Sequence, residues 1–207
     1  MSLALTPNEA AFTVGRDVDA VQRAVDSGVV EKRTRTIRGR ERRVFGRTEL
    51  RFFKVVAGVE DDLTKKGRRK LYEAILHPRG QKVSVGPFEV DIADVDRQIE
   101  DRLADLQRIR GVAATGPEGT VVLRGTSIPV HVVAALAEAG GLEVAERAYP
   151  SLSKTDVQTA VQYATVYPKK GRPYPKKSLK EMLGELALPD DVFGESDDED
   201  GPRVVHL

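Results

Sequence analysis

The chain has 207 residues, a net charge of +1, 40% hydrophobic residues and 5% aromatic residues. It contains no cysteine, which excludes disulfides and thiolate metal sites. The length permits one or two domains, and the scarcity of aromatic residues predicts small cores built from Val, Leu, Ile and Ala.

Charge is divided unevenly along the chain. Residues 1–80 contain 18 Lys and Arg against 11 Asp and Glu, whereas the remainder contains 15 against 21. This asymmetry predicts a nucleic-acid surface on the first part and a different kind of partner for the second. The N-terminus lacks an apolar signal region, and no apolar run approaches the ~20 residues of a membrane helix. We therefore expect a cytoplasmic protein without membrane contact.

Residues 1–78 predict a winged helix-turn-helix domain. A helix that begins at Thr6-Pro7-Asn8-Glu9 runs to about Val14, because Thr, Pro and Glu at these positions favour a helix start. A glycine turn follows, and a second helix covers residues 17–27. Two helices joined by a short turn form the elementary DNA-reading motif.

The same domain continues with a hairpin at residues 34–45, which we interpret as a wing, and with helices from Thr48 and over residues 64–76. Ten Lys and Arg against two acids lie between Lys32 and Lys54, too large an excess for a merely solvated hairpin. Guanidinium groups bind phosphate, and the exposed side of the second helix would choose the bases. The predicted DNA contacts are Arg16, Gln22, Arg23, Arg38, Arg40, Arg42 and Arg43.

Residues 79–112 predict a connecting unit. The segments 83–85 and 88–92 alternate at period two around Gly86-Pro87, which indicates a two-stranded hairpin. A long helix over residues 94–110 follows, with a single apolar stripe. Such a stripe either seals a dimer or packs against its own domain, and the sequence leaves both open. Its members are Val95, Ile99, Leu103, Leu106 and Ile109.

Residues 113–167 predict a second helix-turn-helix domain. A break at residues 116–119 and a strand at residues 120–123 precede helices over 129–139 and 142–149. Ser153 and Asp156 then form a capping box for a helix that ends near Val166. Either this helix reads DNA or the domain serves only for dimerisation or partner binding. Its predicted exposed positions are Lys154, Thr155, Gln158, Thr159 and Gln162.

Residues 168–207 predict a basic linker, an amphipathic helix over residues 178–188 and an acidic tail. Residues 190–200 contain seven carboxylates and no base, a composition that cannot bury enough apolar surface to fold alone. We expect this region to fold onto a partner protein rather than onto its own domain. The predicted apolar anchors are Leu179, Met182, Leu183, Leu186 and Phe193.

The sequence offers no catalytic constellation. The histidines His77, His131 and His206 have no metal-ligand spacing, and no phosphate-cradling glycine loop is present. A calcium loop in the acidic tail fails because Ser196 and Leu207 stand where its first acid and last glutamate are needed. We expect a protein that is not an enzyme and uses neither a metal nor another cofactor.

Several motifs in residues 122–168 resemble a bacterial domain-of-unknown-function family that is associated with VapB-type antitoxins. The similar features are Leu123-Arg124-Gly125-Thr126-Ser127-Ile128-Pro129-Val130, a helix ending Ala139-Gly140, Tyr149-Pro150-Ser151-Leu152-Ser153, and Val157 to Tyr163. The N-terminal domain resembles the winged helix-turn-helix of the MerR and excisionase type through Glu9-Ala10-Ala11, Val14-Gly15 and the wing.

The antitoxin resemblance implies a homodimer that binds its own promoter and neutralises a PIN-like toxin, a metal-dependent ribonuclease. VapB-type antitoxins commonly insert an arginine into the toxin, for which Arg172 and Arg203 are the candidates. The acids at residues 190–200 do not suit a carboxylate-rich cleft. They could instead contact a basic rim of the toxin or compete with DNA for the protein's own wing.

The sequence thus predicts a mainly α protein with short β-hairpins, in which a hairpin and a long helix join two small helix-turn-helix domains. The predicted function is that of an antitoxin and autorepressor whose partners are operator DNA and a PIN-like toxin. The first alternative is a stand-alone DNA-binding transcriptional regulator. An RNA-binding accessory factor is the second.

Overall fold

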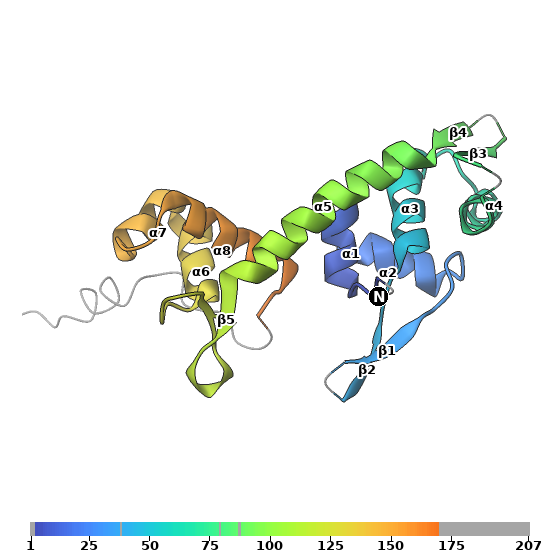
Figure 1. Cartoon of the computed structure of the whole chain (residues 1–207). Helices are drawn as coiled ribbons and strands as arrows, with labels where there is room; N and C mark the ends of the chain where they lie inside the picture. The colour runs from blue at the N-terminus through green and yellow to red at the C-terminus, as the bar shows by residue number, and fades with distance from the viewer. Residues whose placement is uncertain (1–2, 38, 79, 87, 170–207) are drawn as a thin grey trace, which may run out of the picture.

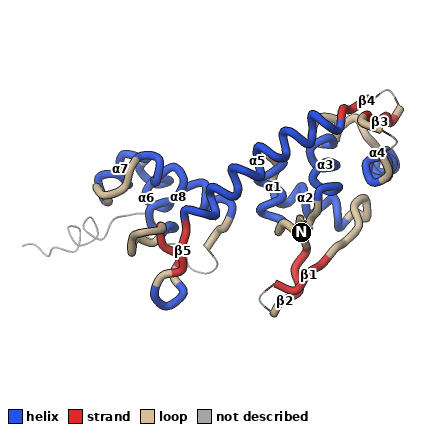
Figure 2. Tube along the Cα trace, viewed as in Figure 1, coloured by secondary structure: helices blue, strands red, loops and turns tan. Residues whose placement is uncertain are grey.

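The computed structural model describes residues 3–37, 39–78, 80–86 and 88–169 (Figure 1). Two groups of short helices lie towards the two ends of the long helix α5 (Ile92–Val112), which gives an elongated molecule. The described residues form eight α-helices and three two-stranded antiparallel hairpins (Figure 2). The prediction of a mainly α fold with short hairpins is confirmed.

The N-terminal group begins with the predicted helix pair. Thr6 donates from its backbone N and from Oγ1 to the Glu9 carboxylate at 2.8 and 2.9 Å, and Gly15 ends the first helix with φ of 70°. These local interactions explain why the helix boundaries follow the sequence signals. The elements are α1 (Pro7–Val14), α2 (Val18–Asp26), β1 (Thr34–Ile37), β2 (Arg40–Arg43), α3 (Arg47–Val56), α4 (Lys65–Leu76), β3 (Lys82–Val85) and β4 (Phe88–Asp91).

Aromatic rings form the centre of the N-terminal core. Phe45 and Phe53 pack edge to face with centroids 5.3 Å apart, and Phe52 packs against Tyr72 in the same way at 5.5 Å. Four of the chain's few aromatic residues are thus concentrated in the N-terminal core. Leu5 extends this core by pairing with Phe45 in an isolated antiparallel bridge.

The C-terminal group starts directly after α5. Its elements are β5 (Ala113–Thr115), a 3-10 turn (Pro117–Gly119), β6 (Val121–Leu123), α6 (Val130–Gly140), α7 (Leu142–Ala148) and α8 (Lys154–Val166). The sequence predicted β6 but not its partner β5, because Ala-Ala-Thr has no strand pattern of its own. The short strand is defined by its pairing with β6.

The segment that follows β6 forms a compact turn. Thr126 Oγ1 donates to the carbonyl of Leu123 at 3.0 Å and accepts from the backbone N of Ile128 at 3.0 Å. Arg124 donates from Nε to the carbonyl of Gly111 at 2.6 Å, where a cation is favourable because α5 ends there. The polar residues of this motif therefore fix the hairpin to the long helix.

The apolar stripe of α5 packs within its own chain. Ile99, Leu106 and Ile109 are at most 1% exposed, so this stripe is already covered in the single chain. Val166 at the end of α8 belongs to the N-terminal core, and it joins the two helix groups. No described helix is both long and apolar enough to cross a membrane.

Candidate nucleic-acid interface

The register of the β1–β2 hairpin separates its side chains into two faces. Residues directly opposite in an antiparallel pair point to the same face, and neighbours along a strand alternate. Arg35 pairs with Arg42 and Ile37 pairs with Arg40, whereas Thr34 pairs with Arg43 and Thr36 with Glu41. Arg35, Ile37, Arg40 and Arg42 therefore share one face, which we call the arginine face.

The opposite face of the hairpin is internally satisfied. Arg43 binds Asp26 of α2 at 2.7 Å, and Thr34 Oγ1 donates to Glu41 at 2.6 Å. These contacts neutralise Arg43 and fix the hairpin against α2. The predicted contact Arg43 is therefore engaged with a carboxylate of the same chain.

The arginine face lacks such partners. Within the described residues, the side chains of Arg35, Arg40 and Arg42 form no ion pair and no hydrogen bond. Arg35 and Arg40 are exposed and Arg42 is half-buried. Like charges directly opposite each other across two strands are destabilising, so the Arg35 and Arg42 pair gains from an anion. The predicted contact Arg38 lies outside the described residues.

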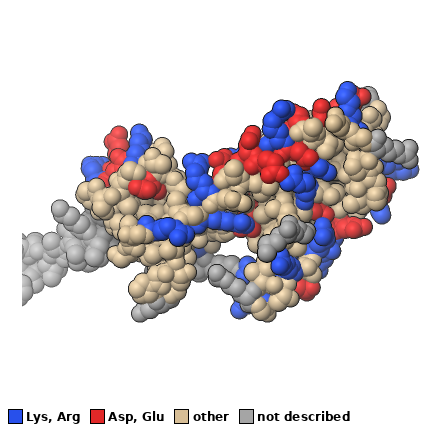
Figure 3. Space-filling model, viewed as in Figure 1, with Lys and Arg blue, Asp and Glu red and all other residues tan. Residues whose placement is uncertain are grey.

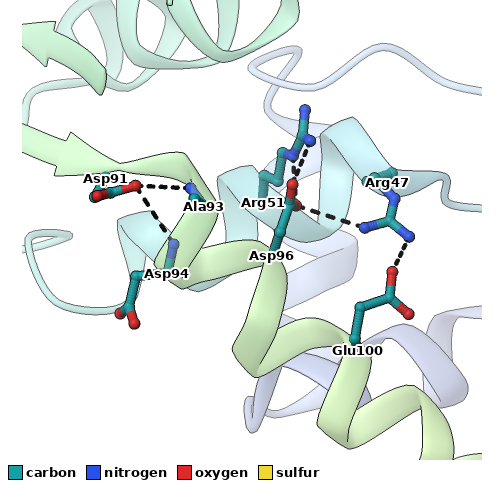
Figure 4. Close-up of polar contacts among 7 residues, drawn as sticks. All are labelled: Arg47, Arg51, Asp91, Ala93, Asp94, Asp96 and Glu100. Atoms are coloured by element: carbon teal, nitrogen blue, oxygen red, sulfur yellow. Dashed lines mark hydrogen bonds and ion pairs between the residues drawn. The ribbon is translucent and has the colours of Figure 1, made fainter. Parts of the chain in front are cut away.

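Other basic residues of the first part hold helices together. Arg51 of α3 donates twice to the Asp96 carboxylate of α5, at 2.7 and 2.6 Å, and Arg47 pairs with Asp96 and Glu100 (Figure 4). The hydrogen bond from Arg51 lowers the pKa of Asp96 below its usual value. Asp91 caps α5 by accepting from the backbone N of Ala93 at 2.8 Å. The positive charges of Arg47 and Arg51 therefore stabilise the contact between α3 and α5 and are engaged within the chain.

Arg16 also forms an internal ion pair. Its guanidinium binds Glu60, and its side chain is 14% exposed. Arg68 approaches the same carboxylate at 3.3 Å. The sequence placed Arg16 among the DNA contacts, but its geometry suits packing between the α1–α2 turn and the segment before α4.

A wide groove lies between the β1–β2 hairpin and the β5–β6 hairpin. It has a volume of about 1270 Å³, and Arg40 and Arg42 contribute to one side and Ala114 and Val121 to the other. Both hairpins project from the same side of α5 (Figure 1). Figure 3 shows a row of Lys and Arg side chains across the middle of the molecule, besides those on the first hairpin. The groove is thus basic on one wall and mostly uncharged on the other.

The floor of the groove contains a buried carboxylate. Glu9 is 6% exposed, and its Oε1 accepts from Arg110 at 2.6 Å and from the Tyr167 hydroxyl at 2.7 Å. Burial raises the pKa of Glu9, but hydrogen bonds from Tyr167, Thr6 and Arg110 outweigh this effect and lower it overall. Burial, and then the hydrogen bond to Glu9, raise the pKa of Tyr167. One carboxylate thus joins α1, α5 and the end of α8.

From the sequence, Glu9 was predicted only to cap the first helix, and neither Arg110 nor Tyr167 was identified. No local signal could have revealed this network, since its members lie up to 158 positions apart along the chain. His131 supports it by donating from Nε2 to the carbonyl of Tyr167 at 2.8 Å.

The outward face of α2 is acidic. Asp19 and Asp26 are exposed on the same side of the helix as Arg23, while Gln22 is half-buried and lines the groove. The predicted base contacts Gln22 and Arg23 are therefore accessible, but Asp19 and Asp26 lie one helical turn on either side of the arginine. A phosphate backbone would meet unfavourable charge on this face.

The outward face of α8 is polar and almost free of acids. Lys154, Thr155, Gln158 and Gln162 are all exposed, as predicted. Thr159 was also predicted to be exposed, and this was wrong: it is 6% exposed, and its Oγ1 donates to the Thr155 carbonyl at 2.7 Å. Thr159 therefore does not belong to the exposed face of α8.

The predicted toxin contacts lie outside the described residues, as do both candidate toxin-blocking arginines; they are Arg172, Leu179, Met182, Leu183, Leu186, Phe193 and Arg203. In the described part of the chain, no three His, Asp or Glu side chains are grouped as ligands of a metal ion.

Comparison with known proteins gives a limited result. Residues 118–164 match a family described as protein of unknown function (DUF433). The uncharacterized protein y4eO of Sinorhizobium fredii (strain NBRC 101917 / NGR234) is 37% identical over 87 residues. That alignment covers 40% of this chain and 39% of the relative. No solved structure matches the chain.

Proposed function

We propose that this protein binds double-stranded DNA and regulates transcription. The observation that supports the proposal most directly is the arginine face of the β1–β2 hairpin. Arg35, Arg40 and Arg42 share this face without a carboxylate partner among the described residues, whereas neighbouring arginines are neutralised. Guanidinium groups bind phosphate oxygens bidentately, and each phosphate contact releases counterions from the duplex.

The arginine face supplies affinity rather than sequence choice in this proposal. Contacts to phosphates position a protein on DNA, whereas contacts to base edges specify a sequence. We assign base contacts to the exposed face of α8, where Gln158 and Gln162 can pair with adenine and Thr155 can contact phosphate or a thymine methyl group. Lys154 adds a positive charge on the same face.

We also propose, on the basis of the antitoxin resemblance, that the protein is a homodimeric antitoxin that represses its own operator and neutralises a PIN-like toxin. The amphipathic segment 178–188 would supply the apolar anchors. A stand-alone regulator without a toxin is the competing proposal. The two differ in a single property, which is stable binding to the product of an adjacent reading frame.

The DNA proposal is tested by measuring fluorescence anisotropy of labelled duplexes over a range of salt concentrations. We compare the full chain with the R35Q/R40Q/R42Q variant. Removing three phosphate contacts should weaken binding to all duplexes by roughly 10- to 100-fold, and it should reduce the slope of log K against log salt by about 3.

A matched control is available on α4, where Lys65, Lys66 and Lys70 are exposed. The K65Q/K66Q/K70Q variant loses the same amount of positive charge, but on α4 and not on the arginine face. It should therefore keep most of the DNA affinity and most of the salt slope. Equal losses in both variants would show that only net charge matters, and an unchanged arginine variant would overturn the assignment of the hairpin. Tighter binding to an RNA duplex would favour the RNA-binding alternative.

The antitoxin proposal is tested by co-expressing the full chain with a neighbouring PIN-like reading frame. A complex that survives gel filtration, with loss of ribonuclease activity, is the expected result. Elution of the two proteins as separate species would favour the stand-alone regulator. The L179A/M182A/L183A variant should break the complex without changing DNA affinity.

A further inference from the structure

The described chain ends at the groove between the two hairpins. Tyr167 and Pro168 line this groove together with Arg40 and Arg42 of the arginine face. Tyr167 is fixed there by its hydroxyl, which donates to Glu9, and by its carbonyl, which accepts from His131. Whatever follows in the chain therefore starts at the rim of the basic groove.

The sequence that follows contains a polyanion. Residues 190–200 contain seven carboxylates and no base, and 21 positions separate them from Lys169. A chain of that length spans at most about 70 Å when fully extended. A tether of this kind gives a local concentration of the order of millimolar, so weak ionic contacts suffice for occupancy.

We propose that the acidic segment 190–200 of this chain binds the arginine face of the β1–β2 hairpin, of which Arg40 and Arg42 line the groove, and competes there with DNA. Arg35 and Arg42 stand opposite each other without a described carboxylate partner, and an intramolecular anion relieves their repulsion. The contact itself depends only on the chain's own charges. Its regulatory consequence, competition with DNA, rests on the proposed function.

The contact is tested first without DNA. Because the chain has no cysteine, Gly194→Cys introduces a single attachment site for a spin label. In the full-length labelled protein at low salt, amide signals of residues 34–43 should lose at least half of their NMR intensity. The loss should disappear at high salt and in the R35Q/R40Q/R42Q background.

Two controls locate the contact. A label at Ser151→Cys, an exposed position between α7 and α8, should leave the hairpin signals intact. The K65Q/K66Q/K70Q background should keep the effect of the label at position 194. If the loss of NMR intensity persists in the arginine variant, or occurs only in other basic segments, the proposal is overturned. The acids would then bind the basic linker or another surface.

Addition of an unlabelled duplex separates this proposal from the DNA proposal. If both hold, DNA restores the hairpin signals, and replacing the seven acids by their amides raises DNA affinity by about tenfold. If the label broadens the hairpin signals but the duplex neither binds nor restores them, the intramolecular contact stands and the DNA proposal fails. If the duplex binds while the label never affects the hairpin, the DNA proposal stands and the contact is refuted.

Discussion

The helices α2 and α8 were both candidates for reading DNA, and they differ in the charge of their outward faces. The face of α2 exposes Asp19 and Asp26 beside Arg23, whereas the face of α8 exposes Lys154, Thr155, Gln158 and Gln162. On α2 the acids are partly structural, since Asp26 binds Arg43 and so fixes the hairpin. On α8 the nearby acid, Asp156, is used for the cap, where it accepts from the backbone N of Ser153 at 2.9 Å.

This difference shows that a helix-turn-helix pattern alone does not identify the reading helix. A helix that holds a basic hairpin in place needs acids, and those acids repel phosphates. In α8 the acid is engaged in the N-terminal cap, so the exposed face of the helix is polar and can contact bases. Within the DNA-binding proposal, we therefore assign support of the arginine face to α2 and base contacts to α8.

The largest expected effect comes from breaking the network that holds the two helix groups together. The Glu9→Gln substitution removes the charge that binds Arg110 and Tyr167. We expect a loss of about 2 to 3 kcal/mol in the free energy of unfolding. This is less than the ~3–5 kcal/mol typical of fully buried pairs, because the Arg110 side chain is 43% exposed. Thermal unfolding monitored by circular dichroism measures the loss.

The same carboxylate predicts the pH dependence of stability. The pKa of Glu9 is lowered in the folded state, so its contribution is present above the unfolded value of about 4.5 and is lost as pH falls through the folded pKa. Urea unfolding between pH 7 and pH 3 should show this decline, and E9Q should show a flatter one. Parallel curves for the two proteins would contradict the role of Glu9.

The next effect tests the α8 assignment directly. The Q158E/Q162E variant gives α8 two carboxylates, as on α2, and should weaken DNA binding by roughly tenfold, equivalent to ~1.4 kcal/mol. The Q98E/Q107E variant makes the same chemical change at two exposed positions of α5. Equal losses in these two variants would mean that α8 has no special place at the DNA.

A smaller effect concerns sequence choice. The Gln158→Ala substitution removes a side chain that can pair with adenine, which is worth about 1 kcal/mol of discrimination. Affinity for random duplexes should hardly change, while the preferred bases should change in sequences selected from a random pool. An unchanged preference would remove Gln158 from the reading surface.

The smallest effect is expected on α2. If this helix faces away from the duplex, Asp19→Asn should change DNA affinity by less than twofold at moderate salt, because the Debye length is about 10 Å at 0.1 M. The measurement is the same anisotropy titration. A gain of fivefold or more would place α2 against phosphates and reverse the comparison.

Local signals in the sequence predicted most of the secondary structure. The Thr6 to Glu9 cap, the glycine after Val14 and the Ser153 to Asp156 cap gave helix boundaries that the structure reproduces within one or two residues. Such signals are interactions between residues a few positions apart, so their outcome is independent of the remaining chain. The strand β5 was not predicted because it has no local signal of its own. Its strand conformation depends on pairing with β6.

The candidate site was predicted less completely. The sequence identified a basic hairpin, but the prediction grouped Arg43 with Arg40 and Arg42 as DNA contacts and left Arg35 out. The pairing register decided that Arg35, Arg40 and Arg42 share a face, and packing against α2 decided that Arg43 does not join them.

What the sequence determined by itself is the type and order of the helices and hairpins, together with the excess of positive charge in the first part of the chain. The tertiary structure decided which of those charges remain available to a partner. Helix caps and turns depend on neighbours along the chain, whereas the pairing of Arg51 with Asp96 and the burial of Glu9 depend on segments that meet only after folding.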